Sequence, residues 1–496
     1  MAKDGRPDGE RSGLGDMGAE EFRAAAHRVA DLAADYLERV ARYRVLPDVS
    51  PGFLRGVLPA AAPAGPEPLE RILRDYLRWI EPHVTHWQHP GFLAYFPSTA
   101  SGPGILGEWL SAALNSNVML WRNAPASTEL EETVVAWLRR AFGLPEAFDG
   151  MLTDTASVSS LLSMVAARQA VPGLEAREEG LAGRPGVSVL RLYCSEEAHS
   201  SIEKAAVVAG IGRRNVVRIP VDAAYRMRVD ELARAIADDR AAGRRPFCVA
   251  ATAGTTSSTS VDPLEEVAEV CAREGLWLHV DAAYAGSAAI VPELRPLLAG
   301  WERADSIVVN PHKWLLTPFD ASLLLFRRPE AYREAFSVVP EYLRTRREGE
   351  AHDYHEYGIQ LGRRFRALKL WFLLRWFGTD GLAARLREHC RLARELAGWV
   401  EAHADWELLA PVPFATVCLR HRPPGLAGRE EEPAVRAELD ARNQAILEAV
   451  NRDGRVFLSH TRLRGRFAIR VSIGSPRTDE SHVRLCWELL RGAAAA

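Results

Sequence analysis

Short apolar segments that alternate with long helical stretches are the feature that most constrains this chain. They run from about residue 100 to beyond residue 320, and the crossovers between them are long enough to hold a helix. Strands covered by helices on both faces of a parallel sheet have this nearly continuous apolar character. We therefore predict an α/β fold with a mostly parallel sheet, whose strands lie at 187–194, 216–219, 247–252, 276–281, 306–310 and 322–326.

Helical patterns precede this region and a mixed pattern follows it. Apolar residues recur at helical spacing over 22–40 and 69–80, and such helices need another surface to bury their apolar stripes. After Gly362, the run RALKLWFLLRWFG predicts a helix, and strand-like segments follow near 415–419 and 467–473. The predicted organisation is a disordered tail at 1–18, an N-terminal helical dimerisation segment at 19–100, a large α/β domain at 101–370 with a charged lid loop at 327–361, and a small C-terminal α+β domain at 371–496.

The charge balance and the cysteines limit the partners and the compartment. The chain has 62 basic and 65 acidic residues, so it has no global positive field that would hold nucleic acid. Its six cysteines lie far apart without a C-x-x-C pair, which favours reduced thiols in the cytoplasm. The N-terminus lacks the apolar core of a signal peptide, and no segment reaches about 18 uncharged apolar residues. We predict a soluble cytoplasmic protein without a nucleic-acid or membrane partner.

Lysine is rare in this chain, and one lysine occupies a chemically informative position. Only four of the 62 basic residues are lysines, and Lys313 follows a predicted buried strand in VVNPHKWLLTPFD. A desolvated lysine can lose its proton and attack an aldehyde, whereas an arginine stays protonated. The alternative is a surface lysine in a chain that favours arginine.

A carboxylate ends the strand before the one that leads to Lys313. Asp281 follows the apolar run 276–280 in LHVDAAYAG, and side chains at the carboxyl ends of parallel strands face the ligand crevice. The alternative role for this aspartate is a helix N-cap. Together, Asp281 and Lys313 are the pair that a pyridoxal 5'-phosphate site needs, with the lysine on the aldehyde and the aspartate on the ring nitrogen.

Longer motifs resemble a known enzyme family. The strings VTHWQHPGFLAYFP, TELEE, EEAHSSIEKA, HVDAAYAGSA, NPHKWLLTPFD and LGRRFRALKLWF occur in this order. The chain resembles the group II pyridoxal-phosphate-dependent decarboxylases, specifically the aromatic-L-amino-acid decarboxylases, over roughly residues 20–490. The resemblance implies a fold-type I large domain like that of aspartate aminotransferase, and a homodimer with the lid contributed across the interface. It also implies a lyase that removes the α-carboxylate of an L-amino acid as CO2 and leaves the amine.

The resemblance also implies roles for individual residues. Lys313 would hold the cofactor aldehyde covalently, Asp281 would keep the ring nitrogen protonated, and His199 would stack on the cofactor ring. The alternative for His199 is a histidine that only begins a helix. The remaining cofactor-binding positions are Ala156 and Ser157 at a helix start suited to the phosphate, and Thr256, Ala283, Asn310 and His312.

The substrate pocket and the final proton donor also follow from the resemblance. Tyr342, in VVPEYLRTR, matches the lid tyrosine that protonates the α-carbon, and the alternative is an exposed aromatic residue in a loop. The pocket positions are Trp87, Tyr95, Phe96, Pro97, Ser98 and Gly362. These aromatic walls favour tryptophan, phenylalanine, tyrosine or dopa as substrate, and Gly362 favours tryptophan. This sequence differs from the family pattern at Asn117, Met119 and Val158.

Three other functions stay open at this point. An aromatic aldehyde synthase or a transaminase would use the same fold, because a fold does not determine the chemistry. A decarboxylase of a non-aromatic amino acid and a cofactor-binding homologue with a regulatory role are the other two. We predict no metal site, because His83, His86 and His89 recur every third residue without a cysteine or an acidic residue at metal-site spacing.

Overall fold

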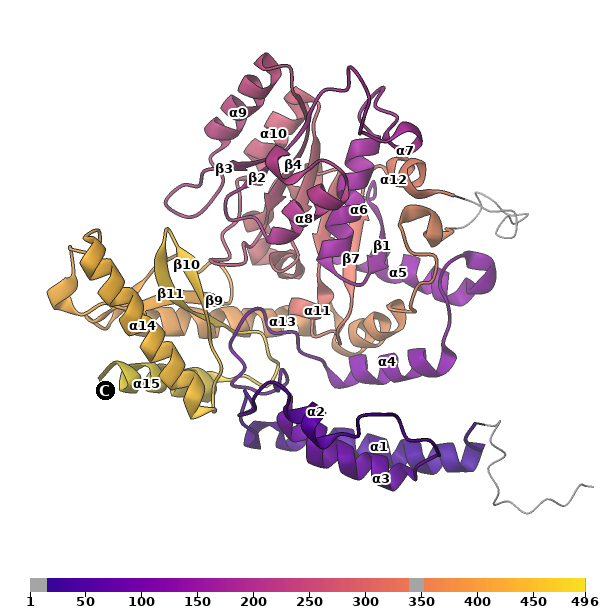
Figure 1. The fold of residues 1–496 in the computed structure, drawn as a ribbon, viewed down its shortest axis with the longest axis vertical. Helices are drawn as coiled ribbons and strands as arrows, with labels where there is room; N and C mark the ends of the chain where they lie inside the picture. Colours follow the sequence, from indigo (N-terminus) through magenta and orange to yellow (C-terminus); the bar gives the residue numbers. More distant parts are fainter. Residues whose placement is uncertain (1–15, 339–351, 496) are drawn as a thin grey trace, which may run out of the picture. The chain divides into compact units, whose positions relative to one another are not determined.

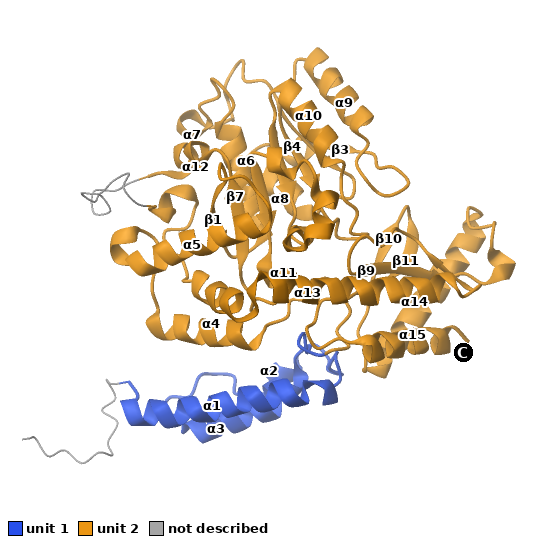
Figure 2. Ribbon diagram, turned by 180° about the vertical axis from the view of Figure 1, so that it is seen from behind, with its two compact units in different colours: residues 1–89 blue, residues 90–496 orange. Residues whose placement is uncertain are grey.

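The chain divides into two compact units. The computed structural model describes residues 16–338 and 352–495. The first unit ends at His89 and the second begins at Pro90 (Figure 2). The predicted domain boundaries stay predictions. The boundary predicted at residue 370 falls inside a long helix.

The first unit is helical. It contains α1 (Ala19–Arg39), α2 (Phe53–Val57) and α3 (Leu69–Asp75), and a π-helical turn at Tyr76–Ile80 continues α3. The buried carboxylate of Glu81 accepts hydrogen bonds from Arg39 Nη2 at 2.9 Å and from the Tyr43 hydroxyl at 2.6 Å. A buried carboxylate is stable only when such donors surround it, so this cluster ties the end of α1 to the turn after α3.

The histidines of the HWQHP region take structural positions in this unit. His86 Nδ1 lies 3.0 Å from the Tyr36 hydroxyl, and the His86 ring stacks on Tyr43 with centroids 4.4 Å apart. Within residues 16–338 and 352–495, no group of three His, Cys, Asp or Glu side chains has the arrangement of a metal site.

A seven-stranded sheet forms the centre of the second unit. Its strands are β1 (Asp149–Thr153), β2 (Leu190–Ser195), β3 (Val216–Ile219), β4 (Arg245–Thr252), β5 (Trp277–Asp281), β6 (Ser306–Val309) and β7 (Ser322–Phe326). Their order is β1-β7-β6-β5-β4-β2-β3, with β7 antiparallel to β1 and β6 and the other neighbouring pairs parallel. Figure 1 labels β1, β2, β3, β4 and β7 of this sheet. The predicted mostly parallel α/β fold is therefore confirmed.

The six predicted strands correspond to β2 through β7, and β1 was not predicted. The segment of β1 contains Gly150, and glycine is disfavoured in strands. Contact with β7 explains why glycine is needed there, because a Cβ on Gly150 would lie 2.6 Å from the Leu324 carbonyl oxygen. The strand thus depends on a tertiary contact and not on local preference.

Helices cover the sheet and bury its central strands at almost every position. Helix α6 (Ala156–Gln169) packs across β1 and β4 through β7, and α8 (Ser200–Val208) packs on α6. Helices α9 (Val229–Ala241) and α10 (Leu264–Glu274) pack against β4. Because side chains of a strand alternate between the faces, strands buried at every position must be covered on both sides.

The predicted lid segment is partly helical. Within 327–361, α12 (Pro329–Phe336) and a 3-10 turn at Tyr354–Tyr357 are described. Proline at the first position favours a helix start, and Tyr332 is fully buried beside Trp277 and Phe326. Packing of this apolar face explains a helix where the sequence, dense in charge, predicts a loop.

The C-terminal part contains a second, antiparallel sheet in the order β10-β11-β9-β8. Long helix α13 (Ala367–Glu401) leads into it and bends at Gly378, where φ is 63°. The other elements are β8 (Trp406–Leu408), β9 (Thr416–His421), α14 (Pro433–Asp453), β10 (Ser459–Leu463), β11 (Arg466–Ser472) and α15 (Glu480–Ala495). None of the helices in the described part of the chain is both long enough and apolar enough to span a bilayer.

Candidate active site

The side chain of Lys313 enters a cavity at the carboxyl edge of the seven-stranded sheet. Strand β6 ends at Val309, Asn310 caps the short helix α11 (Pro311–Trp314), and Lys313 lies on that helix. Its Nζ lies 5.2 Å from the centroid of the Phe96 ring. Burial lowers the pKa of Lys313, and the carboxylate of Asp281 opposes this shift. A lowered pKa increases the fraction of nucleophilic, uncharged amine.

Asp281 ends β5, the strand next to β6, and lines the same cavity. The carboxylate is buried, and its Oδ1 accepts a hydrogen bond from the Ala283 backbone N–H at 3.1 Å. Because β5 and β6 are parallel neighbours, their carboxyl ends meet at one edge of the sheet. This topology explains how residues 32 positions apart in the sequence reach one cavity.

His199 caps the start of α8 and lines the same cavity as Lys313 and Asp281. Its Nδ1 accepts a hydrogen bond from the Ser201 backbone N–H at 3.2 Å and lies 2.8 Å from the Ser201 hydroxyl oxygen. An accepting Nδ1 requires that the neutral ring carries its proton on Nε2. Burial lowers the pKa of His199, and Asp281 opposes this shift. The ring is thus held mainly neutral, with Nε2 as donor.

The first turn of α6 provides an anion-binding position in the same cavity. Ala156 and Ser157 begin this 14-residue helix after Thr155. The first N–H groups of a helix have no partner inside it, and the helix dipole adds partial positive charge there. A phosphate group is the kind of ligand that this end of a helix binds.

All nine residues predicted to bind the cofactor line this one cavity. It measures about 220 Å³, and the structure therefore brings together side chains from β5, α6, α8 and α11. The lining residues are Phe96, Thr155, Ala156, Ser157, His199, Thr252, Gly254, Thr256, Asp281, Ala283, Tyr284, Asn310, His312 and Lys313.

Comparison with known proteins identifies the family. The model of the pyridoxal-dependent decarboxylase conserved domain matches residues 51–422. The chain belongs to the pyridoxal-dependent decarboxylase family. This confirms the resemblance read from the motifs, and with it pyridoxal 5'-phosphate as the cofactor and a carboxy-lyase as the class of enzyme.

Relatives of this decarboxylase match it along nearly its whole length. Aromatic-L-amino-acid decarboxylase from Sus scrofa is 41% identical over 97% of both chains. Phenylacetaldehyde synthase from Arabidopsis thaliana is 40% identical over the same shares. The crystal structure of Oryza sativa TDC with PLP and tryptamine superposes with a TM-score of 0.92 at 36% identity, covering 97% of this chain and 99% of the other. This likeness agrees with the predicted fold-type I architecture.

The residues of this decarboxylase fit its cofactor. In the described part of the chain, the buried Asn310 Oδ1 has no hydrogen-bond partner, so the cavity offers a polar atom that a ligand can satisfy. His312 next to it is fixed by accepting the Ala321 backbone N–H at 3.0 Å on Nδ1. Burial, together with neighbouring Lys313, lowers the pKa of His312 to about 3, so this ring stays neutral.

The predicted substrate residues are placed unevenly. Phe96 lines the cavity and stacks on Tyr284 with ring centroids 3.9 Å apart. Tyr95 is 53% exposed and its ring lies 5.9 Å from that of Phe457. Among the residues that the structure describes, the cavity lining does not include Pro97, Ser98 or Gly362. Their contact with the substrate stays a prediction.

Two predicted residues cannot be related to this cavity. Trp87 belongs to the first compact unit, whereas the cavity belongs to the second. Tyr342 lies outside the residues that the structure describes, so its role as proton donor also stays a prediction.

Sequence reasoning missed two residues at this site, Tyr284 and Arg470. Tyr284 is stacked between Phe96 and Trp314, whose ring centroid lies 4.6 Å away. Arg470 lies over Phe96, with Cζ 4.5 Å from the ring centroid, and it is 3% exposed. A charged residue among the apolar neighbours of FAIRV (467–471) was the available signal for Arg470.

One side-chain nitrogen of Arg470 makes no hydrogen bond to the described residues. Its Nε donates to the Ser257 carbonyl at 3.1 Å, and Nη1 donates to the Tyr95 carbonyl. Nη2 is buried without a hydrogen-bond partner among the described residues. Since a guanidinium stays charged even when buried, this nitrogen is a candidate donor to an anionic ligand group.

Proposed function

We propose that this decarboxylase converts an aromatic L-amino acid to its amine and CO2, with Lys313 as the residue that binds the cofactor aldehyde. The observation that carries the proposal is the meeting of Lys313, Asp281 and His199 in one buried cavity. When bound, pyridoxal 5'-phosphate supplies the electron sink that accepts the electrons left by the departing carboxylate. The chain has to hold the ring, the phosphate and the substrate in place.

The cavity residues divide this work. The carboxylate of Asp281 favours the protonated form of a ring nitrogen beside it. The helix start at Ala156 and Ser157 would hold the phosphate through backbone N–H groups. His199, kept neutral and oriented by Ser201, offers a flat face for stacking and an Nε2–H for hydrogen bonding. These roles match the chemistry of each group, and no further acid or base is required to hold the cofactor.

Arg470 is suited to hold the α-carboxylate of the substrate. The Arg470 guanidinium lies over the Phe96 ring. Its Nη2 atom has no hydrogen-bond partner among the described residues. A carboxylate would give this buried charge a charge-assisted hydrogen bond. Fixing the carboxylate determines which bond at the α-carbon is aligned for cleavage, so Arg470 would act on the choice of reaction as well as on binding.

An aromatic substrate is supported by the cavity and by the relatives. Phe96 and Tyr284 present stacked rings beside Lys313, and aromatic side chains pack well against such rings. The relatives include tyrosine decarboxylase 4 from Petroselinum crispum and tryptophan decarboxylase 2 from Oryza sativa, at 41% and 38% identity. Gly362 favours tryptophan only through the family pattern, and its position outside the cavity of a single chain adds no support.

An aldehyde synthase is the second candidate function. It is favoured by the 40% identity to phenylacetaldehyde synthase and by the likeness to Rhodiola rosea 4-hydroxyphenylacetaldehyde synthase, with a TM-score of 0.87. We rank decarboxylation first because His199 is present, and Tyr342 is present in the sequence at the position of the proton donor.

Product analysis separates these functions. The holoenzyme is incubated with each of the twenty amino acids and with dopa, and products, oxygen uptake and peroxide are measured. We expect amine and CO2 from tryptophan, phenylalanine, tyrosine or dopa without oxygen uptake. Aldehyde with ammonia and peroxide would favour the synthase, a keto acid would favour a transaminase, and turnover of non-aromatic amino acids alone would contradict the aromatic assignment.

We also propose that the enzyme is a homodimer. Helix α4 (Gly102–Leu114) carries Leu106, Trp109, Leu110 and Leu114, which are between 37% and 65% exposed. Their spacing places them on one helix face, and a second copy would remove this apolar face from water. Light scattering should give twice the mass of the chain, and Leu110→Glu should shift it toward the monomer. A monomeric unmodified protein would contradict the proposal.

A cytoplasmic location completes the proposal. All six cysteines are buried and unpaired in the structure. Reduced thiols are typical of proteins in the cytosol. A fluorescent fusion that collects in another compartment would contradict this assignment.

A further inference from the structure

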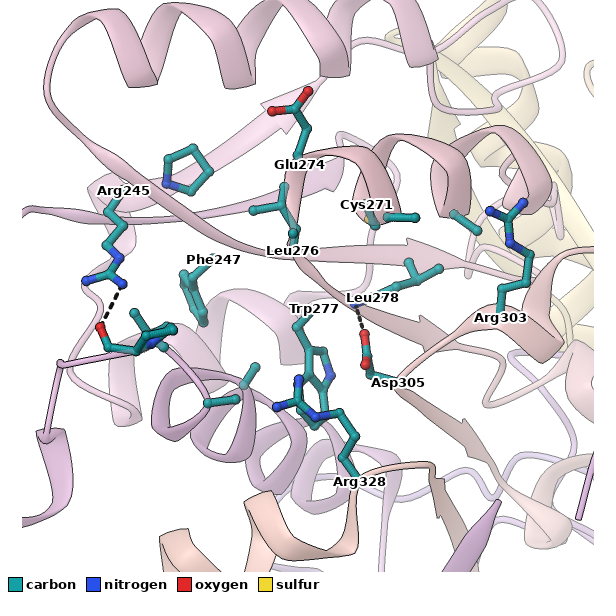
Figure 3. A pocket seen from close by; sticks show the side chains of 18 of the residues that line it. Arg245, Phe247, Cys271, Glu274, Leu276, Trp277, Leu278, Arg303, Asp305 and Arg328 are labelled. Carbon is teal, nitrogen blue, oxygen red and sulfur yellow. Dashed lines mark hydrogen bonds between the residues drawn. The ribbon is translucent and has the colours of Figure 1, made fainter. Parts of the chain in front are cut away.

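A second cavity lies at the opposite edge of the seven-stranded sheet. It has a volume of about 640 Å³ and includes Arg245 and Trp277, which begin β4 and β5 (Figure 3). The Lys313 cavity instead includes Thr252 and Asp281, which end these strands. At about 3.3 Å per residue, the length of β4 separates the two edges by roughly 23 Å. The two cavities share no lining residue.

The second cavity is strongly positive. Five arginines and two acidic residues line it, so its formal charge is five minus two, or +3, whereas the whole chain carries −3. Figure 3 shows Arg245 and Arg303 on opposite sides of the cavity, with Arg328 below them. The charged lining residues are Arg240, Arg245, Arg303, Arg327, Arg328, Glu274 and Asp305.

Only one of these arginines has a close carboxylate partner inside the cavity. Arg240 donates to the Glu274 carbonyl at 2.8 Å and lies 3.3 Å from its carboxylate. Arg245 donates to the neutral carbonyl of Pro172 at 2.8 Å. Within the part of the chain that the structure describes, no ion pair involves Arg327. The two acidic residues of the lining, Glu274 beside Arg240 and Asp305 near Arg327 and Arg328, therefore compensate only part of its positive charge.

The other two arginines have weak partners outside the cavity. Arg303 lies 4.0 Å from Glu269, and Arg328 lies 3.6 Å from Glu330, with all four side chains more than 40% exposed. Exposed pairs at such distances contribute little, and the side chains can exchange partners. Asp305, by contrast, is engaged, because its Oδ2 accepts a backbone N–H of β5 at 2.8 Å.

An apolar floor lies between the arginines. Phe247, Leu276 and Trp277 are each less than 8% exposed, and Figure 3 shows both aromatic rings between Arg245 and Arg303. The Arg328 guanidinium already lies 5.2 Å from the centroid of the Trp277 ring. Such a floor can receive a flat ring, while guanidinium groups bind phosphate oxygens in pairs.

We propose that this cavity binds an organic polyphosphate of nucleotide size, with its planar ring on the apolar floor and its phosphates among the arginines. The positive lining favours a ligand with several negative charges over a monocarboxylate. The volume lies within the range of about 300–1,000 Å³ that is usual for small-molecule sites. The proposal does not depend on the reaction at Lys313, since the sites lie at opposite edges of the sheet.

Calorimetric titration of ATP into the holoenzyme tests this proposal. The holoenzyme is used because its bound cofactor would occupy the phosphate-binding position at Ala156 and Ser157, so that ATP does not bind there. We expect one saturable site for each chain, tighter binding of ATP than of inorganic triphosphate, and weakening by added salt. No saturable binding up to millimolar ATP, or binding of triphosphate as tight as that of ATP, would overturn the proposal.

Paired variants locate the site. Arg245→Gln with Arg328→Gln should weaken ATP binding by at least about tenfold, because two charge-assisted contacts are lost. The matched control is Arg391→Gln with Arg484→Gln, two exposed arginines on α13 and α15, which should leave the affinity within about twofold. Equal losses in both pairs would overturn the proposal, since they would reflect net charge alone.

A single charge reversal keeps the test valid should the first pair fail to fold. Arg303→Glu changes an exposed side chain that makes only a 4.0 Å pair, so folding should be unaffected. It should weaken ATP binding by at least about tenfold while the cofactor absorbance stays normal. Unchanged ATP affinity in this variant would contradict the site.

Discussion

The two edges of the seven-stranded sheet use positive charge in opposite ways. At the carboxyl edge, Lys313 and Arg470 lie in the interior, and burial lowers the pKa of each. At the amino edge, the side chains of Arg303 and Arg328 are more than 40% exposed. Desolvation favours the uncharged, nucleophilic amine of Lys313, whereas the exposed guanidinium groups are suited only to binding anions. One sheet can thus separate a site suited to chemistry from a site suited to binding.

The largest expected effect is at Lys313. Lys313→Ala removes the only amine in the cavity lining that the structure describes, so activity should fall by more than about a thousandfold. The absorbance of the lysine-bound cofactor should disappear as well. ATP binding at the amino edge should persist, which would separate the two edges directly.

Lys204→Ala is the matched control. Lys204 lies on α8, one turn from His199, and is exposed. It should keep both activity and cofactor absorbance. Full activity of Lys313→Ala, or equal loss in Lys204→Ala, would contradict the assignment of the reactive amine.

Two aspartates allow the edges to be compared with the same substitution. Asp281→Asn keeps the shape and can still accept the Ala283 N–H, but it removes the charge that favours a protonated ring nitrogen. We expect a loss of kcat of about a hundredfold or more. The pKa of Lys313 should also decrease, because Asp281 raises it.

Asp305→Asn at the amino edge is the corresponding control. It can still accept the N–H of Leu278 and lies far from the reacting groups. Steady-state kinetics should give kcat within about twofold of the unmodified enzyme. If Asp305→Asn reduces kcat as strongly as Asp281→Asn, the proposed separation of the edges is wrong.

Arg470→Met should produce an intermediate effect. The change keeps an unbranched side chain over Phe96 but removes the donor proposed for the substrate carboxylate. KM should rise by about tenfold or more. The affinity for a decarboxylated amine product should change little, because the amine lacks the carboxylate. Equal weakening of amino acid and amine would indicate a structural role instead.

The smallest effect concerns a charge that is fully paired. His352 bridges Glu132 Oε1 at 2.7 Å and Asp149 Oδ2 at 2.9 Å. These hydrogen bonds raise the pKa of His352 to about 10. A raised pKa means that the contribution to stability is complete below the unfolded value of about 6.5 and is lost as the pH rises through about 10.

His352→Gln therefore tests whether pairing contributes to stability outside both cavities. Thermal unfolding at pH 6 should show a loss of about 1 kcal/mol, a modest value because the side chain is partly exposed. The difference should shrink toward pH 10. A loss that grows with pH would contradict the assigned direction of the shift.

Much of the carboxyl edge could be predicted from the sequence because its residues sit in local contexts that reveal their position. Lys313 and Asp281 follow apolar runs that are recognisable as strands, and parallel strands bring their carboxyl ends together. Ala156 and Ser157 were found through the resemblance of their segment to the phosphate loop of the family. These residues line one cavity, although their roles stay predictions.

Other features depend on contacts between distant segments, so the sequence marks at most an unusual residue and not the residue that it contacts. Arg470 reaches Phe96 from the C-terminal sheet, 374 positions further along the chain. Strand β1 exists because Gly150 fits against β7. The arginines of the amino edge come from three separated stretches of the chain, 240–245, 303 and 327–328, and no sequence pattern links these stretches. Tertiary packing determines all three features.

The most direct measurement of the central claim is to locate the lysine that binds the cofactor. The holoenzyme is reduced with borohydride, digested and mapped by mass spectrometry. The mass of the reduced cofactor should be found on the peptide that contains Lys313 and on no peptide with another lysine. A label on Lys204 or Lys369, or no label in a protein with cofactor absorbance, would contradict the account.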